Sequence, residues 1–91
     1  MYVIREVLHC KPGKVRQMVE KVRGQEPLRL LTDVTGEPYW TIVAEAKVER
    51  IDDFFAMEQQ LTANETLRNT MADYHDLVES GRRAIYRIEN E

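Results

Sequence analysis

Residues 39–48, Tyr-Trp-Thr-Ile-Val-Ala-Glu-Ala-Lys-Val, alternate between two sets of side chains. A period of two is typical of a β-strand, whose successive side chains point to opposite faces of a sheet. One set is apolar throughout and predicts a face under helices: Trp40, Ile42, Ala44, Ala46 and Val48. The other set is mixed, which is unusual for a face washed by solvent: Tyr39, Thr41, Val43, Glu45 and Lys47. Both faces of this strand therefore need a covering.

Segments with the periodicity of strands and segments with the periodicity of helices precede and follow this strand. Residues 2–10 are rich in β-branched and aromatic types and predict a strand. Apolar residues then recur at helical spacing, predicting a helix from Pro12 to near Gly24: Val15, Met18, Val19 and Val22. A second strand is expected over 28–34, followed by a turn at 35–38, and a helix over 51–61.

The last third of the chain predicts another helix and a strand. Residues 62–65, Thr-Ala-Asn-Glu, have capping-box spacing and are expected to start the helix. Its apolar stripe would be Leu67, Met71, Tyr74 and Val78, with Gly81 at its end. A final strand is expected over 83–89.

The order β-α-β-β-α-β predicts an α+β, ferredoxin-like fold: one domain over residues 1–91, with the second helix split in two. Right-handed crossovers place the helices on one face of a four-stranded antiparallel sheet. A chain of 91 residues buries only about 60–65 % of its unfolded surface, so its core is thin. We therefore expect a homodimer, an α/β barrel closed by the open sheet faces, which carry Val3, Arg5, Val7, Tyr39, Thr41 and Val43.

Charge and composition exclude several partners. The net charge of −3 and a pI near 5.4 argue against nucleic acid and against an anionic membrane. The sequence offers neither a membrane span nor a signal peptide, so a cytoplasmic location is expected. One cysteine and two histidines cannot build a structural zinc site in one chain. We expect no metal and no cofactor.

Four motifs carry a family resemblance over nearly the whole chain: Lys11-Pro12-Gly13-Lys14, Leu30-Leu31-Thr32-Asp33 with Gly36, Asp52-Asp53-Phe54, and residues 80–87. The chain resembles NIPSNAP-like and antibiotic-biosynthesis-monooxygenase-like members of the dimeric α/β-barrel superfamily. The resemblance implies a ferredoxin-like protomer, an obligate dimer and, in some members, a pocket between sheet and helices. Those members include cofactor-independent monooxygenases of aromatic substrates, haem-degrading enzymes and proteins of unknown activity.

Haem binding is disfavoured within this resemblance. Haem-degrading relatives use a histidine on a late helix, an asparagine on the first strand and a tryptophan after the third strand. His75 fits the first position, but the first strand has no asparagine and Trp40 begins the third strand. His75 is then either a surface residue or the edge of a pocket.

The predicted ligand-binding residues are Glu6, Trp40, Tyr74, His75 and Tyr86. Glu6 shares a strand face with Ile4 and Leu8, where an ionised carboxylate needs a partner. Hydroxyl and indole groups of Tyr74, Tyr86 and Trp40 would satisfy it in a polar pocket. The alternatives are a first strand turned the other way, or a structural Glu6 near a rim.

Two further pairings are expected among the strand charges. On the open face, Arg5 should pair with Glu45 across strands. A basic cluster, Arg82, Arg83 and Arg87, should pair with the acidic helical segment, residues 49–79, or bind a carboxylate or phosphate.

Two functions remain open. The first is a homodimeric module that is non-enzymatic or binds a small apolar or aromatic ligand between sheet and helices. The second is a cofactor-independent monooxygenase-like enzyme acting on a small aromatic or quinol substrate. A closed core would favour a module without an activity, whereas an open pocket with converging polar groups would favour the enzyme.

Overall fold

A computed structural model describes residues 1–23, 29–35, 39–70, 72 and 74–90. In chain order these residues form β1 (Tyr2–Cys10), α1 (Val15–Val22), β2 (Arg29–Thr32), β3 (Thr41–Val48), α2 (Ile51–Ala63), α3 (Glu65–Thr70), the 3-10 turn η1 (Tyr74–Asp76) and β4 (Val78–Arg87).

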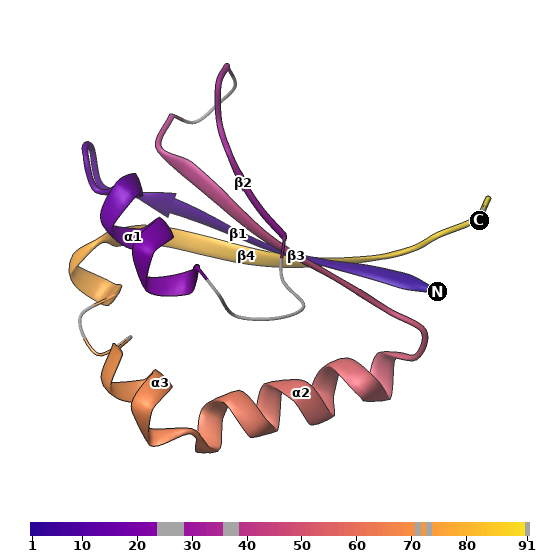
Figure 1. Cartoon of the computed structure of the whole chain (residues 1–91). Helices are drawn as coiled ribbons and strands as arrows, with labels where there is room; N and C mark the ends of the chain where they lie inside the picture. Colours follow the sequence, from indigo (N-terminus) through magenta and orange to yellow (C-terminus); the bar gives the residue numbers. More distant parts are fainter. Residues whose placement is uncertain (24–28, 36–38, 71, 73, 91) are drawn as a thin grey trace.

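The strands form one antiparallel sheet in the order β2-β3-β1-β4. All three α-helices lie on the same side of it (Figure 1). The predicted α+β class, element order and four-stranded antiparallel sheet are confirmed. No described helix covers the other side, which we call the open face.

Strand register settles which residues lie under the helices. Ile4 pairs with Ala46 and Leu8 with Ile42, so the apolar set of β3 lies under the helices as predicted. Glu6 is on the same side, opposite Ala44 on one neighbour and Arg83 on the other. The open face carries the mixed set, and Arg5 lies directly opposite Glu45.

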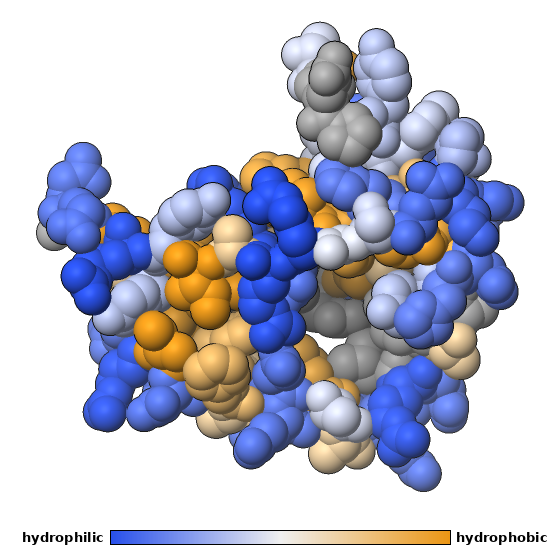
Figure 2. All heavy atoms as spheres, turned by 180° about the vertical axis from the view of Figure 1, so that it is seen from behind, coloured by the Kyte–Doolittle hydropathy of each residue, from blue (hydrophilic) through white to orange (hydrophobic). Residues whose placement is uncertain are grey.

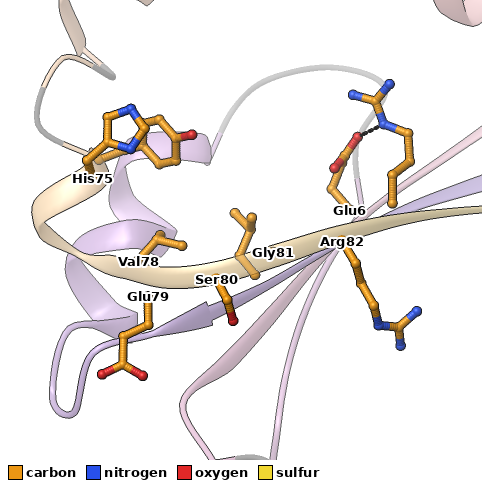
Figure 3. Close-up of a pocket in the computed structure, with 10 residues that line it drawn as sticks. Glu6, His75, Val78, Glu79, Ser80, Gly81 and Arg82 are labelled. Carbon is orange, nitrogen blue, oxygen red and sulfur yellow. Dashed lines mark hydrogen bonds and ion pairs between the residues drawn. The ribbon is translucent and has the colours of Figure 1, made fainter.

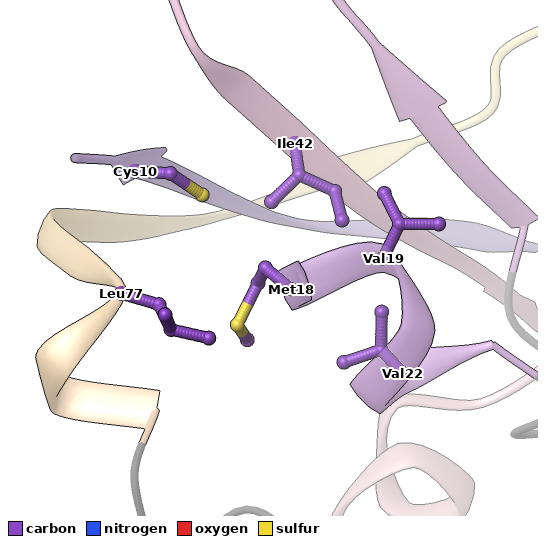
Figure 4. Packing of buried hydrophobic residues seen from close by; sticks show 6 residues of the cluster. All are labelled: Cys10, Met18, Val19, Val22, Ile42 and Leu77. Carbon is purple, nitrogen blue, oxygen red and sulfur yellow. The ribbon is translucent and has the colours of Figure 1, made fainter. Parts of the chain in front are cut away.

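The core lies where α1 packs on β1 and β3 (Figure 4). Met18, Val19 and Val22 are the buried face of α1, as their helical spacing predicts. They pack with Cys10, Ile42 and Leu77. Both ends of the chain thus contribute to one cluster, because Leu77 precedes β4 directly.

Backbone conformation moves two predicted boundaries. Gly13 has φ +77°, which no α-helical residue adopts, so α1 begins at Val15 rather than Pro12. Trp40 has φ +64°, so β3 begins at Thr41 rather than Tyr39. The predicted helix end at Gly24, the strand start at Leu28 and the turn residues 36–38 lie outside the described residues.

The predicted last helix is wrong beyond Thr70. Val78 and Gly81 belong to β4, and Gly81 lies opposite Leu8. A Cβ on Gly81 would lie 2.8 Å from Leu8 Cδ2, so this glycine serves close strand packing and not a helix end. In the predicted stripe, Met71 and the side chain of Leu67 lie outside the described residues.

The predicted capping box is also wrong. Thr62 lies inside α2, where its Oγ1 donates to the Glu58 carbonyl, and Asn64 separates α2 from α3. Among the described residues, no helix has the length and apolar character needed to cross a bilayer.

Candidate functional site: a cavity between sheet and helices

A cavity of about 360 Å³ lies between α2 and the sheet. Phe54 is the one buried side chain in residues 51–63, all of which the structure describes. Three and seven residues after Phe54, on the same side of the helix, Met57 and Leu61 line the cavity. Leu8 and Ala44 line it from the sheet. Apolar side chains of α2 and of the sheet therefore face the same space.

Charged side chains border this apolar space. Arg83 Nε donates to Glu6 Oε1, and Arg83 Nη2 lies 2.8 Å from Glu58 Oε2. The Arg83 guanidinium also lies over the Phe54 ring, 5.0 Å from its centroid. One arginine thus connects β1, β4 and α2 at the edge of the cavity.

At this edge, two carboxylate groups, those of Glu6 and Glu58, lie against the single guanidinium of Arg83. Burial by itself would lower the pKa of Arg83, but hydrogen bonds and charge from Glu6 and then Glu58 outweigh it and raise that pKa. Arg83 is therefore charged at any physiological pH, and the group of three carries one net negative charge.

Seen from behind, the surface of the molecule has a hollow (Figure 2). Hydrophilic side chains lie beside this hollow, and a hydrophobic cluster lies next to them.

A second, more open cleft of about 490 Å³ adjoins the cavity. It shares Glu6, Leu8, Tyr74 and Arg83 with it. His75 lies at its edge, with its ring centroid 4.1 Å from that of Tyr74. His75 and Glu6 lie on one side of β4, whereas Ser80 and Arg82 point to the other (Figure 3). The cleft therefore borders the cavity along these shared residues.

The structure brings together three of the five predicted ligand-binding residues: Glu6, Tyr74 and His75. Trp40 is separate, beside Gly13 and Asp33 at a hollow of about 220 Å³. Tyr86 is on the open face. Neither Trp40 nor Tyr86 joins the cavity that contains Glu6.

Arg83 is the site residue that the prediction left out. It belonged to the predicted basic cluster, and its contact with Glu58 confirms, for this member alone, the pairing with the acidic helical segment. Arg82 lies on the open face and Arg87 over the Tyr2 ring. Register could have found its contact with Glu6, because these residues face each other across β1 and β4. The error in the start of β4 concealed that register.

Within the described residues, no three His, Cys, Asp or Glu side chains, Cys10 included, are grouped so that they could hold a metal ion. Cys10 is buried, and burial followed by the charge of Asp33 raises the pKa of its thiol. It packs as a small apolar residue.

Comparisons with solved structures identify the fold. A NIPSNAP family protein of Agrobacterium tumefaciens has a TM-score of 0.86 at 15 % identity, covering 98 % of this chain and 93 % of that one. An uncharacterized NIPSNAP domain protein of Burkholderia xenovorans has a TM-score of 0.82 at 14 % identity, with coverage of 99 % and 96 %. A candidate antibiotic biosynthesis monooxygenase of Nitrosomonas europaea has a TM-score of 0.68 at 21 % identity, with coverage of 96 % and 97 %.

No family model and no curated protein sequence matches the chain. The predicted resemblance to NIPSNAP-like and antibiotic-biosynthesis-monooxygenase-like proteins is confirmed at the level of the fold. Identities this low carry no reaction from one protein to another.

Proposed function

We propose that the protein binds a small apolar or aromatic ligand in the cavity between α2 and the sheet. The observation that carries this proposal is the unfilled apolar space of about 360 Å³ with charged groups at one edge. Ligand pockets usually have volumes of about 300 to 1,000 Å³ and combine an apolar lining with a few polar groups. This cavity has both properties.

The charged edge indicates which polar group the ligand carries. Glu6 and Glu58 both accept from Arg83, and their carboxylates have further lone pairs for a ligand donor. A hydroxyl group can donate to such an oxygen, whereas a carboxylate ligand would meet the net negative charge. We therefore propose a phenol, naphthol or quinol as the ligand class.

The first test fills the cavity. Ala44→Leu adds three carbon atoms at its sheet side and should weaken binding of 1-naphthol by about tenfold or more. Ala56→Leu adds the same atoms on the exposed side of α2 and should bind as the unaltered protein does. Isothermal titration calorimetry measures both, and circular dichroism checks folding. If a panel of phenols, naphthols and quinols shows no binding to the unaltered protein, the proposal is wrong.

The second candidate function is cofactor-independent oxygenation of an aromatic or quinol substrate. The converging polar groups favour it, since a Glu6 oxygen can take a proton from a phenolic hydroxyl. In such a reaction a phenol or naphthol and O2 become a quinone and water. One oxygen atom becomes the new carbonyl, the other leaves as water with the hydrogens of a ring C–H and of the O–H, and the substrate supplies all four electrons. An oxygen electrode would show uptake that requires substrate and is lost in Glu6→Gln. Binding without uptake would leave only the first function.

We further propose that two copies associate through their open faces. Apolar residues on that face support the proposal: Val3, Val7, Leu31, Val43, Ala84 and Tyr86. Leu31 and Tyr86 are exposed in the single chain, and a second copy would cover them. Such a pair would be the dimeric α/β barrel that the sequence predicts.

A further inference from the structure

The open face contains a hollow of its own, of about 500 Å³, across β1, β3 and β4. Its apolar lining is Val7, Val43 and Ala84. Its polar lining is Arg5, His9, Thr41, Arg82 and Tyr86. The sheet separates this hollow from the cavity described above, and Arg82 points away from Glu6 (Figure 3).

The open face is basic although the protein as a whole is acidic. Register places Arg5, Arg29, Lys47 and Arg82 on it together with Glu45, and Glu79, at the bulge of β4, points to the same side as Ser80 and Arg82 (Figure 3). Glu45 already accepts from Arg5 at 2.8 Å and from Arg29 at 2.5 Å. No acidic residue is among the described residues that line the hollow. The hollow therefore has excess positive charge.

Neighbouring groups hold the polar lining in place. The bond from Arg5 Nε to Glu45 fixes one edge of the guanidinium, and the Tyr86 ring lies 5.6 Å from its Cζ. His9 Nδ1 lies 3.2 Å from Thr41 Oγ1. Side chains fixed before binding lose less conformational entropy when a ligand arrives. Arg5 is thus positioned in advance, and Arg82 faces the same space.

We propose that this hollow binds a small organic anion, a carboxylate on an apolar body. The planar guanidinium groups of Arg5 and Arg82 suit a carboxylate, which accepts two parallel hydrogen bonds. The apolar body would cover Val7, Val43 and Ala84 and pack beside the Tyr86 ring. A bare inorganic anion would leave that apolar lining exposed, so the body is part of the recognition.

The anion also resolves a charge conflict in the proposed dimer. Two open faces brought together would place like charges opposite each other and remove the arginines from water, which is costly without a counter-charge. A carboxylate bound in each hollow supplies that counter-charge. The binding itself requires only Arg5 and Arg82 and is testable whatever the state of association.

The test compares 2-naphthoate with its neutral analogue 2-naphthamide by isothermal titration calorimetry. We expect naphthoate to bind at least about tenfold more tightly and Arg82→Gln to remove most of that difference. Arg87→Gln is the matched control, because Arg87 lies on the same strand over Tyr2 and outside the hollow. Equal binding of the two compounds, or unchanged naphthoate binding in folded Arg82→Gln, would overturn the proposal.

Two further measurements show whether the apolar body contributes to binding and on which side of the sheet naphthoate binds. Inorganic phosphate should compete only weakly, and competition as strong as that of naphthoate would contradict a role for the apolar body. Ala44→Leu should bind naphthoate normally while it loses 1-naphthol, because the two spaces lie on opposite sides of the sheet. Loss of naphthoate binding in folded Ala44→Leu would contradict the assignment to the open face. The two proposals therefore fail independently.

Discussion

At the scale of single residues, Glu45 is the charge most dependent on its partners. Glu45 is only 9 % exposed, and Arg5 and Arg29 donate to its carboxylate from the two neighbouring strands. The hydrogen bond from Arg5 is the main cause that lowers the pKa of Glu45, and together with Arg29 it outweighs the opposing effect of burial. The predicted pair of Arg5 and Glu45 is confirmed, with Arg29 as an additional partner.

A pH series should show this linkage. A carboxyl group with a lowered pKa in the folded state stabilises the fold above its unfolded pKa, and this contribution disappears as the pH falls through the folded pKa. Glu45→Gln should therefore lower the free energy of unfolding by about 1–3 kcal/mol at pH 7. The difference from the unaltered protein should shrink below about pH 4.5, the ordinary value for this group. Urea unfolding at several pH values measures it.

The matched control is Glu20→Gln. Glu20 pairs with Arg23 at 3.4 Å on an exposed helix surface, where an ion pair contributes little. Its effect should be small at every pH. Equal stability of Glu45→Gln and the unaltered protein at pH 7 would show that the bridge does not stabilise the fold.

At the scale of elements, the close approach of β1 and β4 depends on Gly81. In Gly81→Ala the new methyl group would meet Leu8 Cδ2 at 2.8 Å and the Val7 carbonyl oxygen at 3.3 Å. Relieving that contact should lower the free energy of unfolding by about 1–3 kcal/mol. When Leu8→Ala is already present, the cost of the same substitution should be smaller, which a double-mutant cycle by urea unfolding measures.

Ser80→Ala is the comparison for this prediction, since Ser80 points to the other side of β4 (Figure 3). It should change stability little. If Gly81→Ala costs the same with and without Leu8→Ala, the contact with the Leu8 side chain is unimportant.

Short sequence patterns predicted a strand or a helix correctly where the pattern itself defines the buried face of that element. The alternation in β3 and the i, i+3, i+4 spacing in α1 each identify a buried face, and both faces are confirmed. Gly81 was misread because glycine ends helices and also permits close strand contacts, and only the neighbouring strand distinguishes these roles. The same error displaced β4, so the partner of Glu6 was sought among tyrosines and tryptophan instead of Arg83. A site built from three elements requires their register.

At the scale of the whole molecule, the single chain has 10.7 kDa and an exposed apolar and basic sheet face. We expect size-exclusion chromatography with light scattering to give twice that mass at micromolar concentration. Val43→Lys adds a positive charge at the centre of this basic face and should shift the protein toward the monomer, since like charges brought together out of water are costly. Ala56→Lys, on the exposed side of α2, should leave the mass unchanged.

A monomeric mass for the unaltered protein would refute association through the open face. It would leave the cavity under α2 and the hollow on the open face to be tested on their own terms. Addition of 2-naphthoate during the same measurement connects the two proposals, since bound anions should strengthen the dimer if both are correct.

Trp40 gives the molecule an internal optical reporter. It is the only tryptophan of the chain, it lies next to the start of β3, and its carbonyl accepts the Cys10 amide at 2.8 Å. Its indole is outside both proposed ligand spaces. Fluorescence from this one side chain therefore follows the junction of β1 and β3 during unfolding, without direct quenching by a bound aromatic ring.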